Sequence, residues 1–186
     1  MPNWCQNVLY VNHHNKEKMA ALLAAVKAGA MCDHILPMPE QLKGIVSGSC
    51  NIDGQQVRLW RVIDGVETII PADEIEQLEA EYGTASWYEW ALRNWHTKWD
   101  ICDPWDTDQI YHDEGSGDFH VFKFDTAWSP PIGVYEEMVK QGFDVRAEYI
   151  EYGMGFCGDY INGDEYHYDE IPKDRDIDEH LESEYA

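Results

Sequence analysis

The alternation of apolar and polar residues predicts an α+β chain in which short strands are interleaved with amphipathic helices. Residues 6–12 are mostly apolar, which predicts a strand buried on both faces. Residues 16–28 carry apolar side chains at helical spacing, which predicts an amphipathic helix. Further along, 119–128 and 143–149 are predicted strands that flank a helix over 132–141. The chain therefore alternates strands with helices from end to end.

Two dipeptides mark tight hairpins between apolar runs. Asp64-Gly65 separates residues 57–63 from 66–70, and Asn162-Gly163 separates 156–161 from 164–170. The Gly- and Ser-rich stretch 44–56 predicts a loop. We therefore interpret residues 44–70 as an insertion or a peripheral hairpin.

An aromatic-rich helical region lies in the middle of the chain. A helix is predicted to begin at Pro71, and a second one follows Ser86 and continues to Trp99. In this second helix an apolar stripe recurs at every fourth position: Trp87, Ala91, Trp95 and Trp99. This spacing favours a face packed on the core. The weaker alternative is that Trp95, Lys98 and Trp99 form an exposed surface on which nucleic-acid bases stack.

The order of these elements predicts an antiparallel sheet with helices on one face, plus an inserted hairpin and aromatic-rich helices. The ferredoxin-like split β-α-β arrangement is the natural candidate. We expect one domain over residues 1–171 and an acidic tail over 172–186.

The net charge of −23 restricts the possible partners. Residues 1–98 carry 12 acidic and 8 basic residues, whereas residues 99–186 carry 24 acidic and 5 basic ones. Direct binding to nucleic-acid phosphates or to an anionic membrane surface requires a basic footprint, so both are disfavoured. The opening residues lack a signal-peptide pattern, and the five scattered cysteines are typical of reduced thiols. These features predict a cytoplasmic protein.

Several specific segments occur together along residues 1–158. They are Met1-Pro2-Asn3-Trp4-Cys5-Gln6-Asn7, Leu36-Pro37-Met38-Pro39, Trp87-Tyr88-Glu89-Trp90, Asn94-Trp95-His96-Thr97-Lys98-Trp99-Asp100, Phe124-Asp125-Thr126-Ala127-Trp128-Ser129-Pro130-Pro131, Glu151-Tyr152-Gly153 and Phe156-Cys157-Gly158. This set resembles the YubB-like family of small proteins from bacterial plasmids and phages. The resemblance implies a ferredoxin-like later part and a mobile element in a bacterial cytoplasm, but it carries no activity over. The family pattern usually has a glycine where this chain has His96.

The residues offer few candidate chemical sites. Glu165, His167 and Asp169 alternate along a predicted strand, so they could bind a divalent metal from one face, although a solvated hairpin face is the simpler interpretation. Cys32-Asp33-His34 lacks a matching second pair for zinc. Cys157 lies in a negative field that would raise its thiol pKa, which disfavours a nucleophile. No catalytic residue is predicted.

The leading hypothesis is therefore a non-enzymatic acidic protein that binds a basic protein surface. A carboxylate array can occupy a site built for phosphates, so such a chain could mimic DNA and block a host or defence protein that binds nucleic acid. The expected contact residues are Asp164, Glu165, Asp169, Glu170, Asp174, Asp176, Asp178 and Glu179. The alternatives are a metal-binding module or metal-dependent enzyme at Glu165, His167 and Asp169, and a small-ligand domain. The charge could also serve solubility alone.

Overall fold

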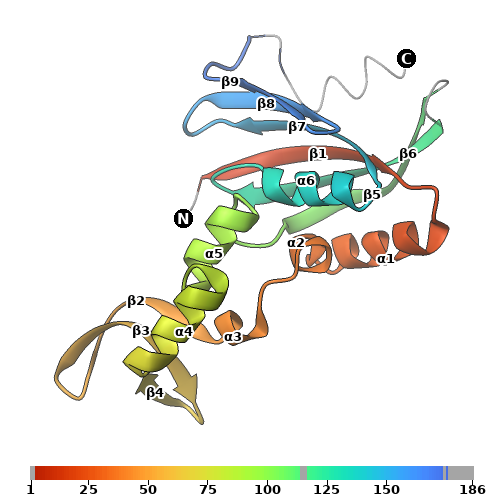
Figure 1. Cartoon of the computed structure of the whole chain (residues 1–186). Coiled ribbons are helices and arrows are strands. Elements are labelled where there is room, and N and C mark those ends of the chain that lie inside the picture. The colour runs from red at the N-terminus through yellow and green to blue at the C-terminus, as the bar shows by residue number, and fades with distance from the viewer. Residues whose placement is uncertain (1–2, 114–116, 174, 176–186) are drawn as a thin grey trace.

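The computed structural model describes residues 3–113, 117–173 and 175. Its main sheet is antiparallel and has six strands in the order β5-β6-β1-β7-β8-β9. The strands span β1 Trp4–Asn12, β5 Cys102–Asp113, β6 Gly117–Ala127, β7 Asp144–Glu151, β8 Phe156–Ile161 and β9 Asp164–Tyr168. Helices α1 (Lys16–Lys27), α2 (Met31–Ile35) and α6 (Ile132–Lys140) lie together on one face of this sheet (Figure 1).

The first strand, first helix and later elements reproduce the ferredoxin-like order. Along the chain β1-α1 is followed by β5-β6-α6-β7, and in space these four strands run β5-β6-β1-β7. This is the antiparallel split β-α-β arrangement, so the predicted fold class is confirmed. The hairpin β8-β9 extends the sheet by two strands beyond β7.

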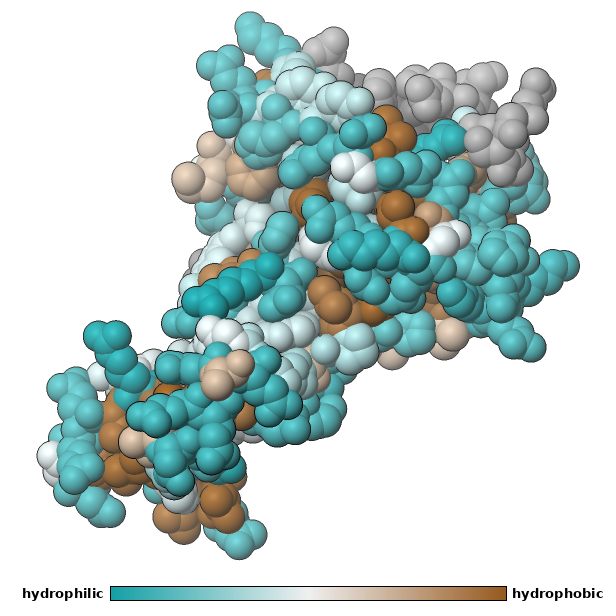
Figure 2. All heavy atoms as spheres, in the orientation of Figure 1, coloured by the Kyte–Doolittle hydropathy of each residue, from teal (hydrophilic) through white to brown (hydrophobic). Residues whose placement is uncertain are grey.

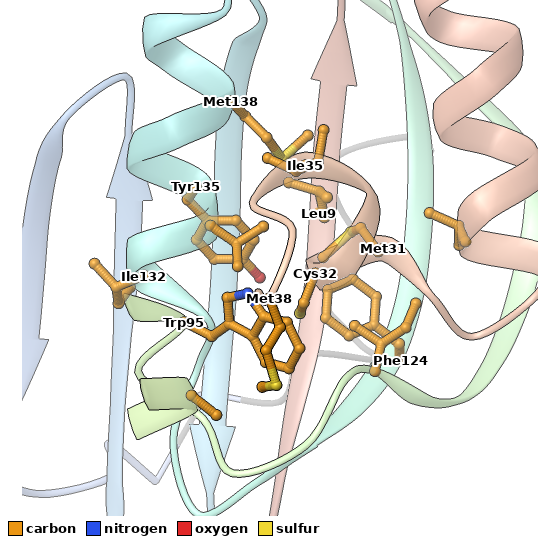
Figure 3. Close-up of a cluster of buried hydrophobic side chains, with 14 of the residues drawn as sticks. Leu9, Met31, Cys32, Ile35, Met38, Trp95, Phe124, Ile132, Tyr135 and Met138 are labelled. Atoms are coloured by element: carbon orange, nitrogen blue, oxygen red, sulfur yellow. The ribbon is translucent and has the colours of Figure 1, made fainter. Parts of the chain in front are cut away.

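The strand alternation decides which side chains form the core. In β7 the residues Val145, Ala147 and Tyr149 are buried beneath the helices, as the sequence pattern predicts. They pack with Leu9 of β1 and Tyr135 of α6 in one large apolar cluster. Figure 3 shows how α6, helix α2 that begins at Met31, and Met38 beyond that helix enclose this cluster against the sheet. The opposite face of the sheet carries a smaller apolar cluster of Val8, Tyr10, Phe119, Val121, Ile150 and Cys157.

The inserted segment is more regular than its composition predicts. The predicted loop 44–56 is wrong, because Ile45–Ile52 forms strand β2, which a tight turn at Asp53-Gly54 joins to β3 (Gln55–Ile63). With β4 (Val66–Ile69) they form a separate three-stranded sheet. The sheet lies beside α3 (Glu40–Lys43) and α4 (Ala72–Tyr82), away from the main sheet (Figure 1). Figure 2 shows this unit as a small lobe with apolar residues on its surface.

The aromatic helix is shorter than predicted. Helix α5 covers Trp87–Asn94 and ends at Trp95, whose indole nitrogen donates to the carbonyl of Leu36 at 2.8 Å in the core. The stripe does not continue to Trp99, which lies beyond the helix and is 36% exposed.

None of the helices in the described part of the chain combines the length and the apolar character that a membrane span requires.

Candidate functional site

The acidic residues that the sequence singles out lie on the outer edge of the main sheet. Asp164 and Glu165 open β9, and Asp169 and Glu170 directly follow it. All four are exposed, as is every residue of β9. The predicted contact residues Asp174, Asp176, Asp178 and Glu179 lie outside the described residues. The structure thus gathers half of the predicted set at one sheet edge.

A tyrosine beneath the hairpin fixes two of the side chains on β9. Tyr149, Gly158 and His167 are directly opposite one another across β7, β8 and β9. Because Gly158 has no side chain, the ring of Tyr149 reaches across β8, and its hydroxyl donates to Oε1 of Glu165 at 2.9 Å. Burial and the Glu165 carboxylate raise the pKa of Tyr149, so the hydroxyl remains protonated. Glu165 is therefore held in one position.

The same tyrosine determines how His167 is used. A hydroxyl has one proton, and that of Tyr149 goes to Glu165, so Nδ1 of His167, 3.3 Å from the hydroxyl, must be the donor in this contact. Nε2 of His167 faces Oδ1 of Asp169 at 3.4 Å. Glu165 and His167 thus point at Tyr149 rather than at a common metal position. Among the residues that the structure describes, no group of three His, Cys, Asp or Glu side chains could hold a metal ion. The metal site stays a prediction.

The edge also lies in a concentrated negative field. Burial, followed by the carboxylates of Glu136, Asp164 and Glu165, raises the pKa of Tyr160 in β8 to about 12. On the other face of the hairpin, Asp159 is neutralised by Arg175, whose Nη2 lies 2.6 Å from Oδ1. The exposed carboxylates of β9 have no such lysine or arginine partner among the described residues.

Comparison with known proteins finds a family model that is similar to the part of the chain that contains this edge. Residues 104–186 match the family model described as the ferredoxin-like domain in Api92-like protein. The match begins in β5 and includes β6 to β9, whereas β1 and α1, which complete the fold order, precede it. The crystal structure of a protein api92 from Yersinia pseudotuberculosis also matches, with a TM-score of 0.42 and 12% identity over 95% of this chain and 100% of that chain. No curated protein matches. The resemblance to the YubB-like family stays a prediction.

An aromatic cluster around Lys98 is the feature that the sequence interpretation considered only as its weaker alternative. The Lys98 ammonium lies 4.4 Å from the ring centre of Trp99, 5.0 Å from that of Trp128 and 5.7 Å from that of Tyr88. Trp4 adjoins Trp99 with ring centres 6.3 Å apart. The three tryptophans are each between 36% and 38% exposed. The predicted buried stripe is therefore confirmed at Trp95, which is 5% exposed, and wrong at Trp99. Two segments that the sequence analysis singled out, 94–100 and 124–131, contain Lys98-Trp99 and Trp128. Their shared aromatic residues could have indicated this cluster.

The backbone beneath this cluster is unusual. The described part of the chain has six non-glycine residues with positive φ, and four of them are Asp or Asn, which tolerate this conformation. The other two are His96 at 66° and Trp128 at 75°. Thr97 donates to the Ala127 carbonyl at 3.0 Å and Ser129 to the His96 carbonyl, which ties the two segments together. His96 thus has the left-handed backbone conformation that glycine adopts most readily.

We expect a stability gain when the strain at His96 is relieved. The His96→Gly variant should exceed His96→Ala in free energy of unfolding by about 1 kcal/mol, because glycine adopts this φ without a Cβ clash. Urea unfolding of the two variants measures the difference. At ordinary surface positions a glycine variant is less stable than the corresponding alanine variant. A lower stability for His96→Gly than for His96→Ala would therefore contradict the presence of backbone strain at His96.

The two cysteines considered as candidates, Cys32 and Cys157, are both buried and have raised thiol pKa values. Cys32 is fully buried, and burial raises its thiol pKa; its backbone amide donates to Asp100 at 2.8 Å. The Cys157 thiol pKa is also raised, first by burial and then by Asp159, while Arg175 opposes the shift. The sequence argument predicted the correct direction of this pKa shift but named only the smaller of its two causes.

Exposed carboxylates also line α4, including Asp73, Glu76 and Glu79, so the acidity is not confined to the second half of the chain.

Proposed function

We propose that this chain is a non-enzymatic protein that binds a basic protein surface through the carboxylates at the β9 edge. In the bacterial cell that the YubB-like resemblance implies, the partner would be a nucleic-acid-binding host or defence protein, and the chain would mimic DNA and block it. The observation that carries the proposal is the exposed array of Asp164, Glu165, Asp169 and Glu170 on one edge of a rigid sheet.

The physical support comes from charge arrangement as well as charge number. Charges arranged on one surface steer a partner of opposite sign and fix its orientation, whereas charge spread over the molecule mainly affects solubility. Tyr149 holds Glu165 in place, and the hairpin fixes the spacing between the two ends of β9. A preorganised array loses less conformational freedom on binding than flexible side chains do.

The test is a pull-down from a bacterial lysate with the full chain as bait. We expect basic proteins to be retained at about 50 mM salt and released at about 500 mM, because screening shortens the Debye length. A short DNA duplex should also release them, since the carboxylates would occupy the DNA site. Retention that resists both salt and DNA would contradict the proposal.

Matched variants separate the β9 edge from net charge. The triple variant Asp164→Asn, Asp169→Asn, Glu170→Gln should weaken binding to the captured protein at least tenfold, roughly the loss of one or two good ion pairs. The variant Asp73→Asn, Glu76→Gln, Glu79→Gln removes the same charge from exposed positions of α4 and should bind almost normally. Equal losses in titration calorimetry would assign the attraction to net charge alone.

A further inference from the structure

We infer that β9 binds its partner by strand addition: an extended basic segment of the partner pairs with the free edge of β9 as a seventh strand of the main sheet. This inference rests on the proposed function and specifies its binding mode. It follows from the backbone of β9, from the contrast with the other sheet edge and from the charge on both faces of the strand.

The outer edge of β9 has backbone groups that no described strand pairs with. Among the residues that the structure describes, β9 has only β8 as a neighbour, and the five pairs from Ile161↔Asp164 to Cys157↔Tyr168 follow one another without a register shift. The turn between the strands has two residues, so the amide of Asp164 points toward β8. In an antiparallel ladder the direction then alternates, so the amides of Glu165 and His167 point outward.

The opposite edge of the sheet carries a proline and register shifts that hinder strand addition, and β9 carries neither. Strand β5 contains Pro104, which has no amide proton, and its pairing with β6 shifts register twice, between Cys102 and Trp105 and between Trp105 and Gln109. Proline and bulges are common devices that prevent edges from pairing. Within the described part of the chain β9 has neither device, and the protective feature that it does carry is charge.

That charge selects the occupant. The side chains of β9 alternate, with Asp164, Tyr166 and Tyr168 on one face and Glu165 and His167 on the other, so each face presents a carboxylate. A second copy of this chain would place like charges side by side and is repelled. A segment rich in lysine or arginine is attracted on both faces. Tyr166 and Tyr168 are 49% and 44% exposed, and Arg175 already lies 5.7 Å from the ring centre of Tyr168, which shows that this face accepts a guanidinium.

Two synthetic peptides of equal charge test the binding mode. One alternates lysine with valine or threonine over nine residues and favours an extended strand; the other has prolines at two of the apolar positions, which prevents pairing. With the alternating peptide at about ten times its Kd, hydrogen exchange of the outward amides of Glu165 and His167 should slow about tenfold in NMR spectra of the full chain. The proline peptide should slow neither amide.

Two variants of His167 separate backbone from side chain. His167→Pro removes one outward amide and no carboxylate, and it should weaken the alternating peptide at least tenfold. His167→Ser removes the imidazole and keeps the amide, so the amount by which His167→Pro binds the peptide more weakly than His167→Ser measures the contribution of the amide; thermal unfolding checks that both variants are folded. If both peptides bind equally without amide protection, strand addition is refuted while charge-driven binding stands. If the wild type binds neither peptide, both proposals fail.

Discussion

The Gly133→Ala variant is expected to lose about 3 kcal/mol of unfolding free energy, one of the two largest effects that this structure predicts. Gly133 lies in the first turn of α6, where a Cβ atom would fall on the carbonyl oxygen of Asn94 at the end of α5. The obstacle is backbone, so no side-chain rotation relieves it. Urea unfolding monitored by circular dichroism measures the loss.

The control for this variant is Gly44→Ala. Gly44 has φ −88°, and a Cβ atom there would meet nothing within 4 Å. This variant should change stability by less than about 0.5 kcal/mol. If Gly133→Ala were as harmless as the control, the close approach of α6 to α5 would be wrong. The effect matters for the site because α5 leads into the Lys98 cluster.

Local patterns in the sequence predict most of the sheet. Residues 143–149 alternate strictly, and Asn162-Gly163 predicts the hairpin whose two turn residues have φ values of 47° and 113°. Both patterns depend only on residues that are close together in the sequence, so they can be recognised without the structure. Strand β5 was not predicted, since Pro104 and its two register shifts disrupt the alternation that marks a strand. The predicted loop over 44–56 failed for a related reason, because its glycines and serines lie in an exposed strand of a small separate sheet.

The candidate site was only partly predictable. Asp164, Glu165, Asp169 and Glu170 were found from charge and the hairpin signal alone. The support beneath them was not, since Tyr149 reaches Glu165 across β8, and a contact over 16 positions leaves no local pattern. An exposed surface at Lys98 and Trp99 was ranked second because helical spacing was extended to Trp99, whereas the chain leaves the helix after Asn94 and adopts positive φ at His96. Tertiary contacts, rather than propensity, decide both cases.

The Gly158→Ala variant is expected to destabilise the β8-β9 hairpin and the site together. A Cβ atom at this position would overlap the hydroxyl of Tyr149 and approach the Tyr166 carbonyl oxygen of β9 at 2.5 Å. Relief requires Tyr149 to leave Glu165 and His167, or β9 to separate from β8. We expect a loss of about 2–3 kcal/mol in urea unfolding, and faster hydrogen exchange in β9 than in β1.

A double-mutant cycle with Tyr149→Leu distinguishes the tyrosine from the backbone as the cause of this loss. Tyr149→Leu alone should cost about 2–4 kcal/mol, because it removes a fully buried ring and its hydrogen bond to Glu165. In the shorter leucine background the added methyl group has room on the Tyr149 side, so the double variant should be more stable than the sum of the single losses by at least about 1 kcal/mol. Strict additivity would mean that the clash with Tyr166 dominates. In that case Gly158 is required for the spacing between β8 and β9 rather than for the path of Tyr149, and the orientation of Glu165 would depend on the hairpin alone.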